Sequence, residues 1–268
     1  NKWYGNGKKF YGGRFGEARK SGETLRQVDK DIAAAAQYAL EETLIQIAQE
    51  AQETTKSKNL CLSGGVALNS VANKKILDKT SFEHIFVQPA SSDDGCALGN
   101  ALLGWSIILG QERKPQNKTI YMGRSYSDEE IHQTVKKYKR WVTPVETDDV
   151  IKETSRLIAQ RHIIGWFQGG SEFGPRALGH RSILCDARFP DMKDILNKRV
   201  KHRESFRPFA PSILAEFNSE YFELDCLSPF MLLIASVKKP QAVPAITNLD
   251  NTARVHTLTK EDNDRYYD

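Results

Sequence analysis

Histidine is scarce in this sequence of 268 residues, and the histidines present are not spaced as metal ligands on a helix. There are six, and neither H-x-x-x-H nor H-E-x-x-H occurs. A self-contained metal-hydrolase site is therefore not expected. The G-x-S-x-G turn that exposes a serine nucleophile is also missing, so serine-based hydrolysis has no support.

Long apolar runs and paired cysteines are missing as well. The longest apolar candidate, Ala97–Leu109, is interrupted by Gly99, Asn100 and Gly104, and it falls short of the roughly 20 residues of a membrane helix. No C-x-x-C pair occurs among the cysteines, which are Cys61, Cys96, Cys185 and Cys226. We therefore expect no zinc site and no disulfide framework, and we predict buried, reduced thiols.

The charge balance is only mildly basic. A net charge of +4 permits an anionic small ligand, but it is too weak to predict binding to nucleic acid. Asn1–Arg14 is polar, aromatic and glycine-rich, which is not the pattern of a secretory signal. We expect a cytoplasmic protein with neither a membrane nor a nucleic acid as its partner.

The first half of the chain alternates helical and strand patterns, which is typical of an α/β fold. Ser63-Gly64-Gly65 turns out of the first strand, and the loop 90–95 follows the second. The predicted elements are a helix at Thr24–Glu53, a strand at Asn59–Leu62, a helix at Val66–Leu77, a strand at Ile85–Gln88 and a helix at Cys96–Leu109.

The pattern restarts after the polar, proline-containing segment Gln111–Lys118. Helices are predicted from a capping box at Ser127 to about Arg140, at Asp148–Gln160 and at Asp191–Val200, and strands at His162–Phe167, Ser212–Ala215 and Phe230–Val237. The tail from Lys238 is expected to be poor in strands. We predict two α/β domains, 1–112 and 119–268, joined by a linker at 113–118.

Cations concentrate in the segment 171–211. The cluster comprises Arg176, Arg181, Lys198, Arg199, Lys201, His202, Arg203 and Arg207. Gly174, Pro175 and Pro208 fix the backbone beside these charges, and Glu172 and Glu204 are placed to orient them. This pattern predicts a pocket for a compact anion, and the alternative is a solvated basic loop.

Two loops at strand ends carry further candidates. Gly64 and Gly65 precede a helix, as in a phosphate cradle, although the same residues also serve ordinary tight turns. Asp93 and Asp94 follow the next strand and are suited either to a hard cation or to capping a helix. Arg254, in Thr252–His256, carries little meaning by itself in a polar tail.

Two motifs in this order are highly specific. GPRALGHRSI (174–183) is followed by K-x-R-E-x-F-R-P-F-A-P (201–211), and NLCLSGGVALN, IFVQPASSDDG and NTARVHTL accompany them. Together they resemble the O-carbamoyltransferase family, which includes nodulation-factor, cephem-antibiotic and aminoglycoside carbamoyltransferases. The resemblance covers about residues 59 to 258.

The resemblance implies a fold and a reaction. Residues 1–112 would be the C-terminal portion of a transfer domain of the actin and sugar-kinase type, and 119–268 most of a YrdC-like domain. Carbamoyl phosphate and ATP would form carbamoyladenylate, whose carbamoyl group then passes to the hydroxyl of a small-molecule acceptor. ATP, carbamoyl phosphate, Mg and Fe(II) or another divalent metal are implied, and a homodimer is left open.

The resemblance also assigns roles to single residues. Catalytic cations around carbamoyl phosphate and ATP are implied at Arg176, Lys201, Arg207 and Arg254. Nucleotide binding is implied for Gly64, Gly65 and Asn69, and metal binding for Asp93.

The sequence departs from the family pattern in two places. The histidine pair of the family's metal site and its N-T-S-F-N segment are missing, so we expect the chain to correspond to the middle of a longer protein. The alternatives are carbamoyl or threonylcarbamoyl transfer to tRNA or to a protein, and a non-catalytic nucleotide-binding scaffold. The acceptor is not identified by any motif.

Overall fold

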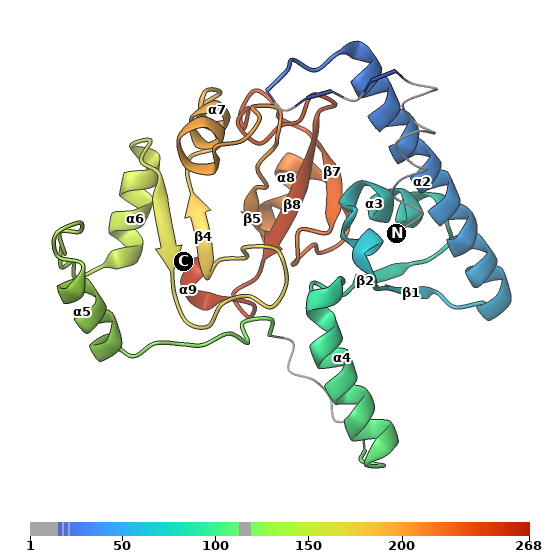
Figure 1. Cartoon of the computed structure of the whole chain (residues 1–268), viewed down its shortest axis with the longest axis horizontal. Coiled ribbons are helices and arrows are strands. Elements are labelled where there is room, and N and C mark those ends of the chain that lie inside the picture. The colour runs from blue at the N-terminus through green and yellow to red at the C-terminus, as the bar shows by residue number, and fades with distance from the viewer. Residues whose placement is uncertain (1–15, 18, 21, 113–118) are drawn as a thin grey trace. The chain divides into compact units, whose positions relative to one another are not determined.

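The computed structural model describes residues 16–268 except 18, 21 and 113–118. The predicted linker therefore lies outside the described residues. The chain forms two compact units, one of Asn1–Lys58 with Lys75–Phe82 and the other of Asn59–Lys74 with Glu83–Asp268. Figure 1 shows the elements along the chain.

The first unit is built on the long helix α2 (Gln27–Thr55), which confirms the predicted helix at Thr24–Glu53. It also contains the second half of α3 (Ser70–Lys79). Glu41 of α2 is almost fully buried and forms an ion pair with Lys75 of α3. A buried carboxylate needs such a partner, because removing an unpaired charge from water is costly.

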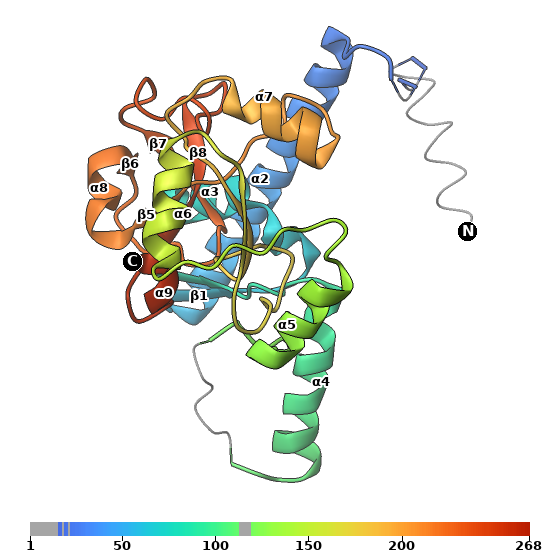
Figure 2. The same cartoon turned by 90° about the vertical axis from the view of Figure 1, so that its left-hand side faces the viewer.

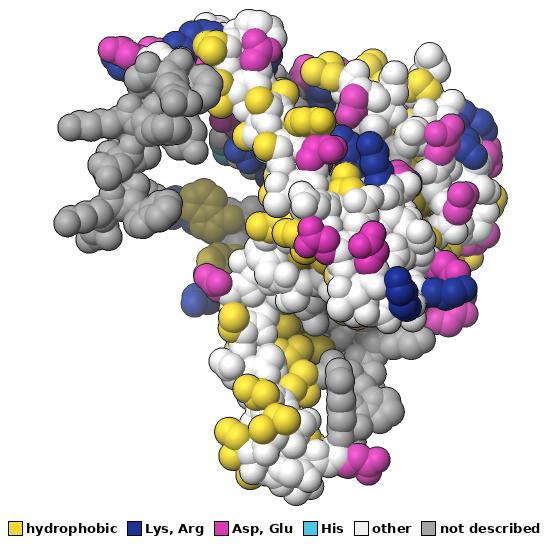
Figure 3. Space-filling model, turned by 90° about the vertical axis from the view of Figure 1, so that its right-hand side faces the viewer, with side chains coloured by type: hydrophobic (Ala, Val, Ile, Leu, Met, Phe, Trp, Pro, Cys, Tyr) yellow, Lys and Arg dark blue, Asp and Glu magenta, His cyan; other side chains and the backbone are white. Residues whose placement is uncertain are grey.

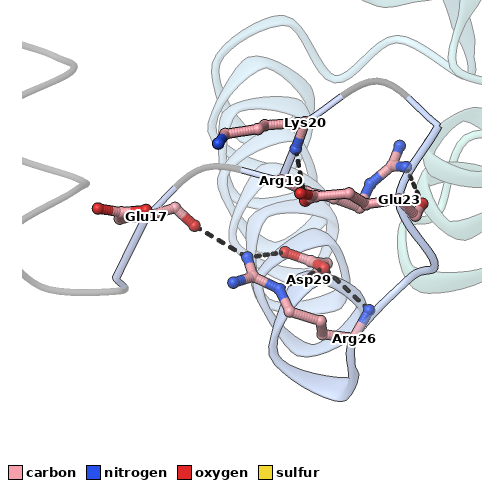
Figure 4. A network of polar contacts seen from close by, with 6 residues as sticks. All are labelled: Glu17, Arg19, Lys20, Glu23, Arg26 and Asp29. Atoms are coloured by element: carbon pink, nitrogen blue, oxygen red, sulfur yellow. Dashed lines mark hydrogen bonds and ion pairs between the residues drawn. The ribbon is translucent and has the colours of Figure 1, made fainter.

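The start of α2 is held by the polar network in Figure 4. A carboxylate oxygen of Asp29 accepts a hydrogen bond of 2.9 Å from the backbone N–H of Arg26. The other oxygen lies 2.7 Å from the Arg26 guanidinium. These bonds lower the pKa of Asp29 to about 2, so this cap is charged at neutral pH.

Three sheets occur among the described residues of the second unit. Strand β1 (Asn59–Leu62) pairs in parallel with β2 (His84–Val87), and β3 (Ile164–Phe167) pairs antiparallel with β4 (Arg181–Leu184). The third sheet has the order β5-β8-β7-β6, and Figure 2 shows it from a second direction. Its strands are β5 (Ser212–Leu214), β6 (Phe222–Glu223), β7 (Leu233–Val237) and β8 (Thr252–Leu258).

The prediction of a strand-poor tail after Lys238 is wrong. Strand β8 is seven residues long, and it lies between β5, to which it is parallel, and β7, to which it is antiparallel. Ala253 and Val255 are fully buried in the main core of this unit. The opposite face carries Thr252, Arg254 and His256, and these polar residues made the segment look like a surface tail.

Three of the predicted helices of the second unit are interrupted, and the short helices α8 (Asn218–Tyr221) and α9 (Asp264–Tyr267) were not predicted. The predicted helix at Asp191–Val200 divides into α7 (Met192–Leu196) and the π turn η4 (Asn197–Lys201). The predicted helix at Val66–Leu77 divides at Asn69 into the 3₁₀ turn η1 (Gly65–Leu68) and α3. The predicted helix at Cys96–Leu109 is α4 (Cys96–Leu103) continued by the π turn η3 (Gly104–Ile108). The other helices are α5 (Asp128–Lys137) and α6 (Val150–Ala159), and the other turns are η2 (Asp93–Gly95) and η5 (Ala215–Phe217).

The predicted capping box at Ser127 is confirmed. The Ser127 hydroxyl accepts a hydrogen bond of 3.2 Å from the backbone N–H of Glu130, and the Glu130 carboxylate accepts one of 2.9 Å from the N–H of Ser127. Both donors would otherwise lack a partner inside α5, because the first turn of a helix has no preceding carbonyls.

Exposure corrects the prediction for the thiols. Cys61, Cys96 and Cys226 are exposed, and only Cys185 is partly buried.

Apolar side chains gather over the far end of α4 and η3 (Figure 3). No helix among the described residues is both long and apolar enough to cross a membrane.

Candidate functional site

The loop that carries Arg176 is fixed by a carboxylate and a glycine. One oxygen of Glu172 accepts hydrogen bonds from the backbone N–H groups of Leu178 and His180, at 2.7 and 2.9 Å. Burial alone would raise the pKa of Glu172, but such N–H donors bring it below its ordinary value. Glu172 therefore orients the Arg176 loop through its backbone, whereas we had predicted that it orients a cation.

Gly174 allows this loop to approach the end of β2. Its φ is +127°, and a Cβ there would lie 2.7 Å from the carbonyl oxygen of Pro89. A residue with a side chain fits neither the dihedral angle nor the space. The tight turn brings Arg176 to η1, where Nη2 donates a hydrogen bond of 3.4 Å to the carbonyl of Leu68.

Arg176 and Arg254 are neighbouring cations without counter-ions. Each is partly buried, each has a buried Nε with no hydrogen-bond partner, and neither forms an ion pair with any described carboxylate. Burial lowers the pKa of Arg176. Burial, followed by repulsion from Arg176 and Arg203, lowers the pKa of Arg254 to about 10. Both remain charged at neutral pH, so the arrangement attracts an anion.

Arg207 belongs to the same charged region through Arg203. Burial and repulsion from Arg207 lower the pKa of Arg203, against the attraction of Glu204. Arg207 is exposed and donates through Nε to the Glu204 carboxylate at 3.0 Å. The expectation that Glu204 orients a cation is thus confirmed.

Lys201 is not joined to these arginines by any contact of the described residues. It is the last residue of η4 and is exposed. Arg181 has a different environment again, because it donates to the carbonyls of Gln168, Gly169 and His180 and lies over the Phe167 ring. Arg181 therefore holds the backbone of this loop in place.

The predicted glycine loop and the predicted metal ligand share one cavity. The backbone N–H of Gly64 donates to the carbonyl of Ser91 at 2.8 Å, which joins the loops that follow β1 and β2. Gly64, Gly65 and Asp93 line a cavity of about 480 Å³ beside this joint. Loops at the carboxyl ends of parallel strands are common ligand sites.

Asn69, the third residue predicted to bind nucleotide, has a structural contact. Its side-chain oxygen accepts a hydrogen bond of 3.1 Å from the backbone N–H of Ala72, which caps α3. Asn73, which the sequence did not indicate, is fully buried and donates to the carbonyls of Ala67 and Leu232 at 2.8 and 3.0 Å. These amides stabilise η1, the turn that Arg176 contacts.

The residues around Asp93 do not by themselves fit a metal ion. Asp93 is exposed, and the described parts of the chain contain no group of three or more His, Cys, Asp or Glu side chains arranged to hold one. A divalent cation in a protein needs several such oxygen or nitrogen ligands. Asp93 therefore provides a single exposed carboxylate on the wall of the cavity.

A second cavity of about 370 Å³ is mainly apolar, and Arg176, Arg203, Arg207 and Arg254 do not line it. It extends between β4 and β5, and Ser212 and Tyr266 lie on its wall. Ser212 Oγ is 2.9 Å from Nδ1 of the buried His256 and accepts a hydrogen bond of 3.0 Å from Tyr266. Burial lowers the pKa of His256 to about 4, so this imidazole is neutral at pH 7. None of the predicted catalytic cations lines this cavity.

Comparison with known proteins places these residues in a family. Residues 8–102 match the family model described as Carbamoyltransferase N-terminus, and residues 155–268 match Carbamoyltransferase C-terminus. The chain belongs to the carbamoyltransferase family. These matches confirm the resemblance found in the sequence, and they support the prediction that the protein is an enzyme.

Three relatives show how far the similarity extends. Nodulation protein NolNO of Sinorhizobium fredii is 41% identical over 94% of this chain and 38% of its own length. Nodulation protein NolO of Bradyrhizobium diazoefficiens is 39% identical over 94% and 47%. The 3'-hydroxymethylcephem-O-carbamoyltransferase of Streptomyces clavuligerus is 33% identical over 87% and 43%. The chain thus spans less than half the length of these relatives.

Proposed function

We propose that the protein is an ATP-dependent O-carbamoyltransferase. In this proposal, carbamoyl phosphate and water give carbamate and orthophosphate, and carbamate and ATP then give carbamoyladenylate and pyrophosphate. The carbamoyl group finally passes to the hydroxyl of a small molecule, with release of AMP. The single observation that carries the proposal is the pair of partly buried arginines, Arg176 and Arg254. Among the described residues, their Nε atoms have no hydrogen-bond partner and their charges form no ion pair with a carboxylate. Relatives named as O-carbamoyltransferases agree with it.

The arginines suit the adenylation step. Phosphoanhydride exchange moves negative charge onto the oxygens of the leaving pyrophosphate, and fixed guanidinium donors stabilise that charge without reorganising. Arg176 and Arg254 would bind those oxygens, with Arg207 at the exposed edge of the same region. Lys201 is retained in the proposal as a further cation. We assign these residues to the YrdC-like domain that the resemblance implies.

The cavity at Gly64, Gly65 and Asp93 suits the transfer step. Glycine backbone at the start of a turn accommodates a close ligand, and the Asp93 carboxylate can accept a hydrogen bond from an incoming hydroxyl. We assign this cavity to the transfer domain of the actin and sugar-kinase type. These three residues line only part of the cavity, so they do not determine which acceptor it binds.

The test is an assay of the full-length protein with radiolabelled carbamoyl phosphate, ATP and candidate hydroxyl acceptors. We expect ATP-dependent formation of carbamoyladenylate and pyrophosphate in the absence of acceptor, and transfer of label when acceptor is added. Failure to form carbamoyladenylate together with failure to transfer label would refute the proposal. Binding of tRNA that weakens steeply with salt would instead favour transfer to RNA.

A further inference from the structure

Two strands of the second unit each have an unpaired edge beside the same cavity. Among the described strands, β4 pairs only with β3 and β5 pairs only with β8 (Figure 1). The mainly apolar cavity of about 370 Å³ is lined by residues 183–185, at the end of β4, and by the whole of β5. Side chains alternate between the two faces of a strand, so consecutive residues line a cavity only where the edge of the strand faces it.

Helix α6 directs an amphipathic face to this cavity. Ile151, Thr154, Ser155 and Ile158 line it, and their spacing places them on one side of the helix. None of the residues of α6 is buried. A helix with such a face ordinarily packs it on a sheet, because burying isoleucine removes apolar surface from water. The face of α6 is therefore one that a further strand would cover.

Trp166 of β3 adds a polar group without a partner. Its side chain lines the cavity, and its Nε1 is buried and has no hydrogen-bond partner among the described residues. A buried indole N–H ordinarily finds an acceptor. An oxygen of the molecule that fills the cavity would satisfy this donor.

The protein itself can supply the occupant. Tyr266, Tyr267 and Asp268 line the cavity, so polypeptide that continues from Asp268 starts at the cavity wall and needs no linker to enter it. The relatives have room for such a segment, because the chain covers only 38% of the length of nodulation protein NolNO and 47% of that of NolO.

We infer that a strand from the segment that follows Asp268 in the full-length protein inserts between β4 and β5 and pairs with both. The two-stranded and four-stranded sheets then form one sheet, with the inserted strand between β4 and β5. A strand in this position satisfies backbone groups on both of its sides, whereas a strand added to one edge leaves the other edge unpaired. The face of the strand toward α6 should be apolar. The inference does not depend on the proposed reaction.

The first experiment places a photo-crosslinking phenylalanine analogue at position 183 of the full-length protein. Ile183 lines the cavity and is 39% exposed, so a larger side chain can be accommodated. Irradiation should join this position to the segment that follows Asp268, as a cross-link within one chain that peptide mass spectrometry identifies. Ile131 of α5 is 42% exposed and is the matched control. The analogue at position 131 should give no cross-link to that segment.

Hydrogen exchange of the full-length protein tests whether the occupant is paired as a strand. In an antiparallel edge strand, alternate N–H groups point away from the neighbouring strand and exchange quickly. We expect the consecutive amides 182–184 of β4 all to exchange slowly, at rates within about tenfold of one another. An open edge would instead give slow and fast exchange in alternation.

The combined results decide the inference. A cross-link from position 183 to the segment that follows Asp268, together with slow exchange of all three amides, supports it. A cross-link only to another part of the protein or to a second copy, no cross-link, or alternating exchange overturns it. If the variant at position 183 does not melt cooperatively, the same analogue in place of Ile151 decides by the same criteria, because Ile151 lines the cavity from α6.

Discussion

Arg254 lies in an environment that an unliganded fold does not favour. It stands on a central strand, its Nε has no partner, and the nearest charges that act on it are other arginines. Burying a cation among cations destabilises the protein, and such arrangements are typical of functional sites. A substitution at Arg254 should therefore increase the free energy of unfolding and decrease the affinity for the ligand.

Replacing Arg254 with methionine tests both effects. The change removes a charge and a buried unpaired donor while keeping most of the volume, so the melting temperature without ligand should rise by about 2–4 °C for each kcal/mol of repulsion relieved. The increase in melting temperature that pyrophosphate gives the unmodified protein should disappear. Differential scanning calorimetry with and without pyrophosphate measures both, and a variant that melts lower yet still responds to the ligand would contradict the expectation.

His256 predicts a loss of stability in mild acid. Its pKa of about 4 in the folded protein lies below the ordinary value of about 6.5, so the unfolded chain takes up a proton that the folded chain excludes. The free energy of unfolding should fall on the order of 3 kcal/mol as the pH drops from about 6.5 to about 4. Urea titrations across this range should show a flatter dependence for His256→Gln. The control variant His84→Gln, at an exposed histidine, should lose as much stability in acid as the unmodified protein. If the free energy of unfolding depends equally on pH in the two variants, His256 is not the cause of the loss.

At the scale of elements, the turn at Gly174 determines where the Arg176 loop lies. We expect Gly174→Ala to destabilise the protein by about 1–3 kcal/mol, because alanine is strained at this φ and its Cβ meets the backbone of Pro89. Arg176 should move with the loop, so pyrophosphate binding should weaken as well. Gly165→Ala is the control, since a Cβ there meets nothing within 4 Å. If calorimetry shows normal pyrophosphate affinity in Gly174→Ala, the turn at Gly174 does not position the pyrophosphate site.

The sequence predicted elements well where one face is apolar and poorly where polar residues line a buried strand. The periodicity of α2 and the capping box at Ser127 follow from local chemistry and were recovered. Strand β8 was missed because Thr252, Arg254 and His256 occupy the face covered by other loops, and that cover is a tertiary contact. For the same reason the sequence revealed the cluster of basic residues. It did not reveal that Arg176 forms no ion pair with any described carboxylate.

For the whole molecule, the proposal separates two half-reactions. Arg207→Ala or Lys201→Ala should abolish formation of carbamoyladenylate and leave transfer from supplied carbamoyladenylate largely intact. Asp93→Ala should do the reverse, because its carboxylate lies in the cavity lined by Gly64 and Gly65. Pyrophosphate release and acceptor carbamoylation, assayed separately, measure the two steps. Damage to the same step by both kinds of variant would mean that the assignment to two sites is wrong.

The two partly buried arginines that form no ion pair with a described carboxylate, Arg176 and Arg254, have a consequence for how long the protein survives in a cell. A ligand that binds only the folded state adds about 1.4 kcal/mol of stability for each tenfold excess over its dissociation constant. Proteases cut chains that open transiently, and the open fraction falls by the same factor. The abundance of the protein should therefore follow the supply of nucleotide, with turnover fastest when energy is short.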